Sequence, residues 1–299
     1  MDIRNIGLVG YGEVGKIFGP ALKAQAGIAA VGAWDLKFAD AATRAAEQAH
    51  AERAGVVAQA SMQALCAASD LIISAVTASN TLAVAQEAAS HIRRGAVFLD
   101  LNSASPATKQ QAGAVIDAAG GRYVEAGVMT SVPPSGIKVP MLLGGASAAE
   151  LATVLAGWGM DAKPVSQRLG VAAAIKMCRS VMIKGLEALV IESYTTAREY
   201  GVEGYVLATL AETFPSIEWQ QQGAYYFSRV VRHGKRRAEE MREAANTVRE
   251  AGFEPFMSAA TAGKQQFVAD AAAEGVFEDV AKDAGWQEYA DRLIAARKQ

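Results

Sequence analysis

The sequence predicts a doubly wound α/β domain followed by an all-helical domain, and two observations support this prediction. From Ile3 to about Val165, short apolar runs alternate with alanine-rich helical stretches, which is typical of a parallel sheet with helices on both faces. From Gln167 onward the strand signals stop and the pattern is helical throughout. A length of 299 residues also suits two domains, since one domain usually takes about 100–200 residues. We therefore predict a first domain over residues 1–166 and a second over residues 167–299.

The predicted strands are short apolar segments that each lead into a helical stretch. They lie at Ile3–Val9, Val31–Trp34, Leu71–Ser74, Val97–Leu101, Tyr123–Ala126, Met141–Leu143 and, more weakly, Lys163–Val165. Because helical sequence separates each strand from the next, we expect the strands to run parallel. In the second domain, glycine or proline predicts helix breaks near Gly201, Pro215, Gly234, Gly252 and Gly275.

A glycine-rich loop follows the first predicted strand and precedes a helix that runs to about Gln25. In this context Gly10 permits a tight turn, Gly12 lets a pyrophosphate approach the backbone, and Gly15 allows the helix to pack closely on the strand. The start of the helix adds N–H donors for phosphate. We therefore predict a Rossmann dinucleotide-binding domain. The predicted cofactor contacts in this loop are Gly10, Tyr11, Gly12, Glu13, Val14 and Gly15.

Asp35 directly follows the second predicted strand, about 20 residues beyond the glycine loop, where an acidic side chain accepts hydrogen bonds from the adenosine ribose. A 2′-phosphate beside Asp35 would be repelled, although Lys37 would offset part of that repulsion. NAD is therefore the predicted cofactor, and NADP stays open. The alternative is a glycine turn beside a surface aspartate, which the combination of strand, loop, helix and acid disfavours.

Two further strand ends lead into small polar residues and then a new helix. They should lie at the carboxyl edge of the sheet, where cofactors bind in such folds. Asn80 and Ser105 are predicted to be helix N-caps, with Pro106 in the first turn after Ser105. The predicted cofactor contacts at this edge are Val76, Thr77, Asn102 and Ser103.

A long uninterrupted helix is predicted from Gln167 to Gly201. Apolar residues recur at helical spacing, no proline interrupts the segment, and Gly201 is a suitable C-cap. At roughly 1.5 Å per residue the helix spans about 50 Å, which is more than one small domain needs. Lys176 lies in its first turns, and Ser180 follows one turn later on the same face. Lys184 continues this face and is expected to reach solvent or a second subunit.

Three segments resemble the β-hydroxyacid dehydrogenases, the family of 3-hydroxyisobutyrate dehydrogenase and, more distantly, 6-phosphogluconate dehydrogenase. Ile6–Gly15 looks like the opening signature of that family, and Asp100–Pro106 looks like its D-x-S-T-x-S-P stretch. Gly170–Lys176 resembles its G-x-x-x-x-x-K entry into the long interdomain helix. The resemblance covers nearly the whole chain. It implies that Lys176 is the catalytic acid/base, with Ser180 beside it, and that the protein is a homodimer or a larger homo-oligomer through its helical domain.

Two departures from the family fall where its members hold the substrate. The stretch usually written D-x-P-V-S-G-G is here Glu125–Ser131, and Ser180 stands where the family has an asparagine. The segment Arg232–Met241 resembles a branch whose C-terminal domain is a domain of unknown function. Lys138 and the pair His233 and Arg237 are secondary candidates, and a solvated helix entry is the alternative for the pair. The predicted substrate contacts are Met129, Thr130, Ser131, Lys176, Ser180, His233 and Arg237.

Hydride transfer between an alcohol carbon and a nicotinamide needs a group that takes the hydroxyl proton or returns it to the carbonyl. Lys176 can serve in this way, because an ammonium also stabilises a developing alkoxide. The ordinary alternative is an exposed helix lysine. We therefore predict an NAD-preferring dehydrogenase or reductase that acts on a small β-hydroxyacid-like alcohol or its carbonyl partner. The alternatives are an imine reductase on the same fold and a non-catalytic dinucleotide-binding sensor.

Composition limits the partners of the chain. A net charge of −2 provides no general attraction to nucleic acid or to an anionic membrane, so small molecules and a second copy are the expected partners. The first residues run straight into an apolar strand without the features of a signal peptide, and a cytoplasmic location is expected. Cys66 and Cys178 lie in apolar helical surroundings, which favours buried thiols over a disulfide or a metal site. No metal is predicted.

Overall fold

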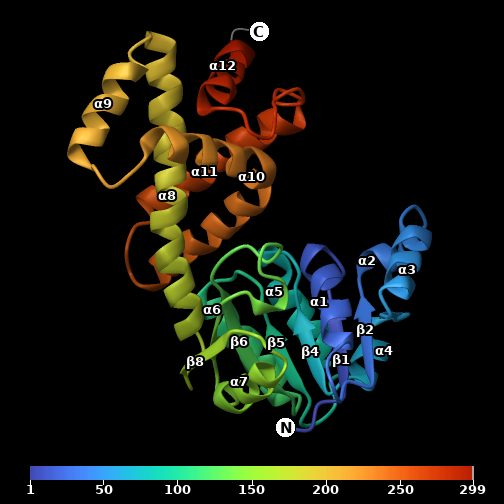
Figure 1. Cartoon of the computed structure of the whole chain (residues 1–299). Helices are drawn as coiled ribbons and strands as arrows, with labels where there is room; N and C mark the ends of the chain where they lie inside the picture. The colour runs from blue at the N-terminus through green and yellow to red at the C-terminus, as the bar shows by residue number, and fades with distance from the viewer. Residues whose placement is uncertain (298–299) are drawn as a thin grey trace. The chain divides into compact units, whose positions relative to one another are not determined.

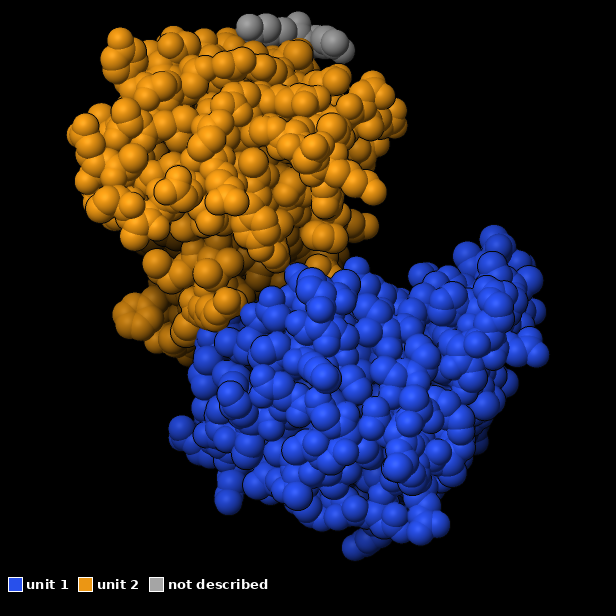
Figure 2. Space-filling model, in the orientation of Figure 1, with its two compact units in different colours: residues 1–177 blue, residues 178–299 orange. Residues whose placement is uncertain are grey.

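The computed structural model describes residues 1–297, and its contacts divide the chain into two compact units. The first unit comprises residues 1–177, and the second begins at Cys178 (Figure 2). The first unit is a sheet flanked by helices, which confirms the predicted fold class (Figure 1). The sheet has eight strands, one more than predicted. The second unit, over its described residues, contains helices and no strand. Helix α8 (Val171–Tyr200) begins in the first unit and continues into the second.

The sheet has the strand order β3-β2-β1-β4-β5-β6-β7-β8, so the chain crosses over between β3 and β4. The order in which strands are added to the sheet therefore reverses between the neighbours β1 and β4. Doubly wound sheets bind their ligands at such a point, outside the carboxyl ends of the strands. The strands are β1 (Asn5–Val9), β2 (Ala30–Trp34), β3 (Val57–Ala58), β4 (Leu71–Ser74), β5 (Val97–Asp100), β6 (Arg122–Val128), β7 (Met141–Gly144) and β8 (Ala162–Ser166).

Helices connect the strands and then make up the second unit. The short 3-10 turns η1 (Ala78–Asn80) and η2 (Gly136–Lys138) precede α5 and β7. The other helices are α1 (Glu13–Lys23), α2 (Leu36–Ala39), α3 (Arg44–Arg53), α4 (Met62–Ala68), α5 (Thr81–Ala89), α6 (Pro106–Ala118), α7 (Ala148–Gly157), α9 (Glu203–Thr213), α10 (Trp219–Glu250), α11 (Phe256–Ala273) and α12 (Trp286–Arg297).

Strands β7 and β8 differ from the prediction, because they run against the rest of the sheet. β7 pairs antiparallel with β6, with Gly144 opposite Glu125, and β8 pairs parallel with β7. The doubly wound fold class is therefore confirmed, but the expected parallel direction is wrong for β7 and β8. The physical reason is the connection between β6 and β7, which contains only the turn η2 and no crossover helix of the length that a parallel pair requires. The two-residue strand β3 was also missed, since so short a segment carries no periodicity.

Apolar side chains fill both faces of the sheet. Ile73 and Leu99 enter one buried cluster, whereas their neighbours Ile72 and Phe98 enter the other. Successive residues of a strand point to opposite faces, so continuous apolar runs are expected of a sheet that helices cover on both sides. A separate cluster around Phe227 and other aromatic side chains forms the core of the second unit.

Helix α8 begins at Val171, later than the predicted start at Gln167. Gly170 has a φ of 94°, which is not a helical conformation, so the helix can begin only after it. The far end agrees with the prediction, because Gly201 has a φ of 66°. The N–H of Val202 donates to the carbonyl of Ala197 at 3.0 Å, which completes a Schellman cap around Gly201.

Helix α10 continues through Gly234, so the helix break predicted there was wrong. A Cβ placed on Gly234 would lie 2.9 Å from the carbonyl oxygen of Gln265 and 3.0 Å from Cβ of Ala269. Gly234 therefore marks a close approach of α10 to α11. The packing of two long helices outweighs the cost of glycine in a helix, which is about 1 kcal/mol.

Candidate functional site

The glycine loop between β1 and α1 combines two close backbone contacts with one open position. Gly10 has a φ of 95°, and a Cβ on it would lie 2.4 Å from the carbonyl oxygen of Ala75 at the end of β4. A Cβ on Gly15 would lie 2.3 Å from the carbonyl oxygen of Gly10, so α1 approaches the turn closely. The Cβ position of Gly12 is open, with no atom within 4 Å. Each glycine has the geometry expected for its predicted role, and the loop leaves space at the start of α1.

Asp35 connects the end of β2 to this loop. Its Oδ2 accepts a hydrogen bond from the N–H of Tyr11 at 2.7 Å, and its Oδ1 accepts one from the N–H of Lys37 at 2.9 Å. The carboxylate is thereby held beside the loop, where the ribose of a dinucleotide would lie. The side chain of Tyr11 points into the core, and its hydroxyl lies 3.1 Å from Nδ1 of His50. Tyr11 can therefore contact a ligand through its backbone only.

The ends of β4 and β5 are joined by Asn102. Its Oδ1 accepts a hydrogen bond from the N–H of Val76 at 2.7 Å, and its Nδ2 donates to Oγ of Ser74 at 3.0 Å. Asn102 is 3% exposed. Its two hydrogen bonds therefore connect the ends of β4 and β5 inside the protein. Thr77 is exposed in the loop after β4 and accepts a hydrogen bond from Nδ2 of Asn80 at 2.8 Å. Ser105 caps α6, as predicted, whereas Asn80 makes no side-chain cap on α5.

A buried polar cluster that the sequence did not reveal lies beneath this edge. Nζ of Lys109 is 2.9 Å from Oδ1 of Asp100, and the two side chains are 1% and 0% exposed. The hydroxyl of Tyr123 donates to Oδ2 of Asp100 at 2.6 Å, and the N–H of Asn102 donates to Oδ1 at 2.8 Å. Burial, with the nearby Asp100 carboxylate, raises the pKa of Tyr123. The cluster fixes the backbone just before Asn102, and the lysine in its helical sequence carried no pattern that marked it as buried.

Lys176 and Ser103 meet at the carboxyl edge of the sheet. Nζ of Lys176 donates a hydrogen bond to Oγ of Ser103 at 2.5 Å, and both side chains are half-buried. Ser103 follows β5, and Lys176 lies in the second turn of α8, so two segments distant in sequence converge. Their contact lies outside the carboxyl ends of the strands, the side on which doubly wound folds bind ligands.

The loop after β6 contains Met129, Thr130 and Ser131, which the sequence predicted to contact the substrate. The N–H of Met129 donates to the carbonyl of Pro140 at 2.9 Å, Thr130 is exposed and Ser131 is half-buried. A Cβ on Gly127 would lie 2.9 Å from the carbonyl oxygen of Ala172 and 3.4 Å from Cβ of Lys176. The loop therefore begins directly beside the part of α8 that carries Lys176.

Glu125 is a buried acid for which the sequence suggested no role. It is 0% exposed, and its Oε1 accepts hydrogen bonds from the N–H groups of Gly170 at 2.9 Å and Ala172 at 3.0 Å. Burial raises the pKa of Glu125, although the nearby Lys109 and these hydrogen bonds oppose the shift. The available signal was an acidic residue inside the apolar strand that contains Val124 and Ala126.

Ser180 and Lys184 lie farther along α8, within the second unit. Nζ of Lys184 donates to Oγ of Ser180 at 3.1 Å and lies 2.8 Å from Oε2 of Glu240 on α10. Lys184 is 6% exposed, so the prediction that it reaches solvent or a second subunit was wrong. Helical periodicity alone could not show this, because the partner that neutralises Lys184 comes from a distant helix.

Arg237 and His233 lie on α10, which also belongs to the second unit. Arg237 is 4% exposed, and its Nε donates to Oε2 of Glu187 at 3.0 Å. Its Nη2 contacts both oxygens of the same carboxylate. His233 is half-buried one turn earlier. The guanidinium that the sequence suggested for substrate binding is therefore engaged by an acidic side chain of α8.

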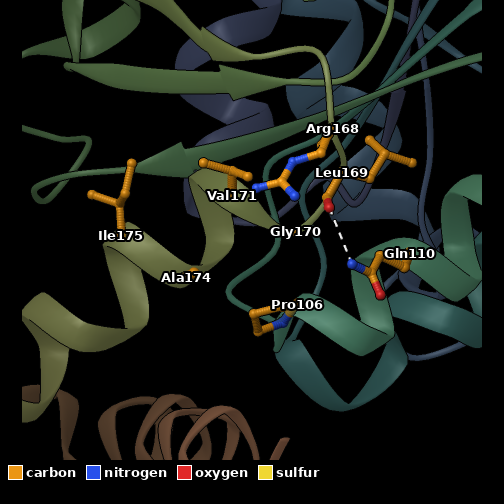
Figure 3. Close-up of a pocket in the computed structure, with 8 residues that line it drawn as sticks. All are labelled: Pro106, Gln110, Arg168, Leu169, Gly170, Val171, Ala174 and Ile175. Atoms are coloured by element: carbon orange, nitrogen blue, oxygen red, sulfur yellow. Dashed lines mark hydrogen bonds between the residues drawn. The ribbon is translucent and has the colours of Figure 1, made fainter. Parts of the chain in front are cut away.

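A hollow with a volume of about 390 Å³ lies beside the start of α8 (Figure 3). Arg168 and Ile175 line it, together with Gln110, whose Nε2 donates to the carbonyl of Leu169 at 3.1 Å. None of the residues predicted to bind cofactor or substrate lines this hollow. It therefore belongs to the surface around the entry into α8.

The remaining features agree only in part with the sequence predictions. Cys66 is buried, but Cys178 is exposed, so the prediction of a buried thiol was wrong for Cys178. Among residues 1–297, no group of three or more histidine, cysteine, aspartate or glutamate side chains is arranged to hold a metal ion. Within the same residues, no helix is both long and apolar enough to cross a membrane.

The sheet, the glycine loop and the aspartate that follows β2 define the class of the protein. Residues 5–159 match the family described as the NAD binding domain of 6-phosphogluconate dehydrogenase, which covers just over half of the 299 residues. Residues 197–268 match a domain of unknown function, DUF1932. The chain is thus related to nicotinamide-dependent oxidoreductases. It belongs to the β-hydroxyacid dehydrogenase family, in a branch with a C-terminal DUF1932 domain.

Solved structures with the same fold extend over nearly the whole chain. A conserved hypothetical protein from Sinorhizobium meliloti 1021 has 37% sequence identity and a TM-score of 0.78, over 100% of this chain and 97% of that one. A conserved protein of unknown function, described as similar to 3-hydroxyacid dehydrogenases, has 28% identity and a TM-score of 0.69, over 91% and 99%.

Two characterised proteins share the fold at lower identity. A 3-hydroxyisobutyrate dehydrogenase from Mycobacterium tuberculosis has 16% identity and a TM-score of 0.67, over 97% of this chain and 99% of that one. An imine reductase from Aspergillus terreus has 19% identity and a TM-score of 0.56, over 92% and 95%. These likenesses confirm the predicted fold and leave the substrate open.

Proposed function

We propose that this protein is an NAD-preferring dehydrogenase or reductase for a small β-hydroxyacid-like alcohol and its carbonyl partner. The observation that carries the proposal is the contact between Nζ of Lys176 and Oγ of Ser103, at the carboxyl edge of a dinucleotide-binding sheet. The nicotinamide cofactor, when bound, accepts or supplies the hydride. The chain itself must then hold the substrate and move one proton.

Lys176 is the group that we assign to proton transfer. In the reduction direction its ammonium donates a hydrogen bond to the substrate carbonyl oxygen and delivers the proton as the alkoxide forms. In the oxidation direction the neutral amine takes the proton from the hydroxyl. Oγ of Ser103 already accepts a hydrogen bond from Nζ, so it orients the ammonium before the substrate arrives.

The loop after β6 supports the assignment of substrate contacts to Met129, Thr130 and Ser131. Gly127 brings the start of this loop against Lys176, and the two hydroxyl groups are available as hydrogen-bond donors. We keep Ser180 and His233 as proposed contacts farther along the chain. Arg237 is left out of the proposal, because Glu187 neutralises its guanidinium.

Asp35 supports the preference for NAD. Its carboxylate lies beside the glycine loop with both oxygens held by backbone N–H groups, so a 2′-phosphate would meet a fixed negative charge. The variant Asp35→Asn removes this charge and keeps most of the shape. We expect its affinity for NADP to rise relative to NAD in fluorescence titrations. An unchanged ratio of the two affinities would contradict the assignment.

The decisive experiment measures hydride transfer with a panel of small hydroxyacids and their keto partners. Lys176→Ala should lower turnover by about 10²–10⁴-fold while cofactor affinity stays nearly unchanged. Lys163→Ala, which alters a lysine whose side chain is 75% exposed, is the control and should retain full turnover. Equal turnover in Lys176→Ala and wild type would refute the role of the lysine.

The fold shared with an imine reductase makes that activity the second candidate. Reduction of cyclic imines without any turnover of hydroxyacids would favour it. Binding of NADH without turnover on either panel would favour a dinucleotide-binding sensor. The catalytic role of Lys176 is what distinguishes our proposal from both alternatives.

We also propose a homodimer, or a larger homo-oligomer, formed by the helical unit in the cytoplasm. Met182 and Leu189 on α8 are 73% and 54% exposed, and Phe267 on α11 is 55% exposed. A second chain that packs on α8 and α11 would bury these side chains. A monomeric mass by light scattering at micromolar concentration would contradict this part of the proposal.

A further inference from the structure

We propose that Glu125 is a positioning residue for Lys176, because its carboxylate fixes the first turn of α8 and so places the lysine ammonium against Ser103. This inference rests on the proposed role of Lys176. It assigns a function to a buried acid that touches neither the cofactor loop nor the predicted substrate contacts.

The start of α8 needs a cap that its own sequence does not supply. The N–H of Ala174 donates to the carbonyl of Gly170 at 2.9 Å, so Gly170 occupies the N-cap position and has no side chain to cap with. Oε1 of Glu125 takes over this task from β6, through the N–H groups of Gly170 and Ala172. A carboxyl oxygen is also a favourable acceptor at the positive end of a helix dipole.

Strand β6 also contacts α8 at Gly127, closer to Lys176. Two residues after Glu125, the missing side chain of Gly127 lets the strand pass the carbonyl of Ala172 and Cβ of Lys176. The first turn of α8 is therefore held by Glu125 and rests on Gly127. Lys176 lies one turn after Ala172, so a shift of the first turn moves its ammonium away from Ser103.

The surroundings of Glu125 are built to hold the carboxylate in one place. Gly144 lies opposite Glu125 in the antiparallel pair of β6 and β7, and a Cβ on Gly144 would be 2.4 Å from Oε1. Lys109, from α6, is the nearby cation that acts on Glu125. Oε2 of Glu125 is buried without a hydrogen-bond partner. A buried acid with an unsatisfied oxygen carries a desolvation cost, which a role in positioning explains.

Three variants separate positioning from a general contribution to folding. Glu125→Gln keeps an acceptor oxygen at Oε1 and replaces only the unpartnered oxygen, so it should preserve the position of the first turn. Glu125→Ala removes the cap. Gly144→Ala retains Glu125 and displaces its carboxylate by steric contact, which keeps the test possible if Glu125→Ala fails to fold.

The readout is the environment of Lys176 itself, measured by NMR after reductive methylation of the lysines with ¹³C-formaldehyde. Lys176→Arg identifies the signal, and Ser103→Ala shows how far it moves when the contact is lost. We expect Glu125→Ala and Gly144→Ala to move the signal as Ser103→Ala does, and Glu125→Gln to leave it in place. A signal at the wild-type position in a folded Glu125→Ala or Gly144→Ala protein would overturn the inference.

A second readout is turnover once a substrate is known. Misplacement of the lysine should lower kcat by up to about 10²-fold in Glu125→Ala, with little change in the affinity for NAD, while Glu125→Gln restores kcat. The NMR measurement does not depend on the reaction. A failure of the proposed function, seen as full activity of Lys176→Ala, is therefore distinguishable from a failure of the positioning role.

Discussion

Glu187 on α8 and Arg237 on α10 form a buried ion pair in the core of the helical unit. The side chains are 1% and 5% exposed, and Nε and Nη2 of the arginine both contact the carboxylate. Nε2 of Gln265 on α11 donates to the same carboxylate at 3.3 Å. Three helices that are distant in sequence thus share one acidic group. Removal of only one partner is costly, because it leaves the other charge buried without its counter-charge.

Removal of one member of this pair should destabilise the protein strongly. Arg237→Ala leaves the buried carboxylate with only the hydrogen bond from Gln265 and the more distant Arg229, whose Nε lies 3.8 Å from Oε1 of Glu187. We expect a loss of about 3 kcal/mol in the free energy of unfolding measured in urea. The double variant Glu187→Leu, Arg237→Met should recover most of that loss.

The control for this experiment is Lys264→Ala. Lys264 pairs with Glu192, whose side chain is 65% exposed, so the expected cost is about 0–1 kcal/mol. If Arg237→Ala costs no more than Lys264→Ala, the buried pair does not hold the helices together.

Gly234 should tolerate no side chain, although it lies within a helix. Gly234→Val would force α10 away from the carbonyl of Gln265 and from Ala269, with an expected cost of about 1–3 kcal/mol and a lower thermal midpoint. Gly204→Ala, at a helical glycine with open space around its Cβ position, should instead gain up to about 1 kcal/mol. A stabilised Gly234→Val protein would show that the close approach of α10 and α11 is absent in solution.

The buried carboxyl of Glu125 predicts a pH dependence of stability. Burial raises its pKa above the ordinary value of 4.5, so the folded protein disfavours the charged form. The stability associated with the neutral form is fully present below that ordinary value and is lost as the pH rises through the pKa of the folded state. Glu125→Gln should therefore unfold near the wild-type temperature at about pH 4 and at a higher temperature at about pH 8. A difference between the two proteins that does not change with pH would contradict this prediction.

The two thiols should react at very different rates. Burial, with the nearby Glu87 carboxylate, raises the pKa of Cys66 to about 12, whereas Cys178 is exposed. We expect iodoacetamide to modify Cys178 in the native protein and Cys66 only after unfolding, as judged by mass spectrometry of the peptides. Native Cys178→Ser should remain unmodified. Modification of its Cys66 without unfolding would show that the strand and helix around it open readily.

The predictions from sequence were best where the signal is local. The glycine loop, Asp35 and the strand ends lie within short segments, so spacing alone showed which residues the fold brings together. Ser103 was expected at the carboxyl edge of the sheet and Lys176 in the first turns of the long helix, but their contact was not predicted. The C-cap at Gly201 followed from a single residue type whose backbone conformation is nearly unique.

The sequence did not reveal interactions that depend on a partner from a distant segment. In the sequence alone, Lys184 and Lys109 are expected at the surface. In the structure, Lys184 pairs with Glu240 and Lys109 pairs with the buried Asp100. Glu125 caps a helix that begins far along the chain. In each case the residue type suggests solvent, and only the tertiary structure supplies the charge or the hydrogen bond that allows burial.

The reversed direction of β7 and β8 has a consequence for how Lys176 reaches the edge of the sheet. β8 runs toward the edge of the sheet at which the parallel strands begin, so α8 starts beside Glu125 in the middle of β6. From there α8 continues past Gly127 toward the carboxyl edge of the sheet. Lys176 reaches the carboxyl edge of the sheet in the second turn of α8, one turn after the N–H groups that Glu125 binds. Had these strands followed the direction of the others, α8 would have started at that edge and carried Lys176 away from it.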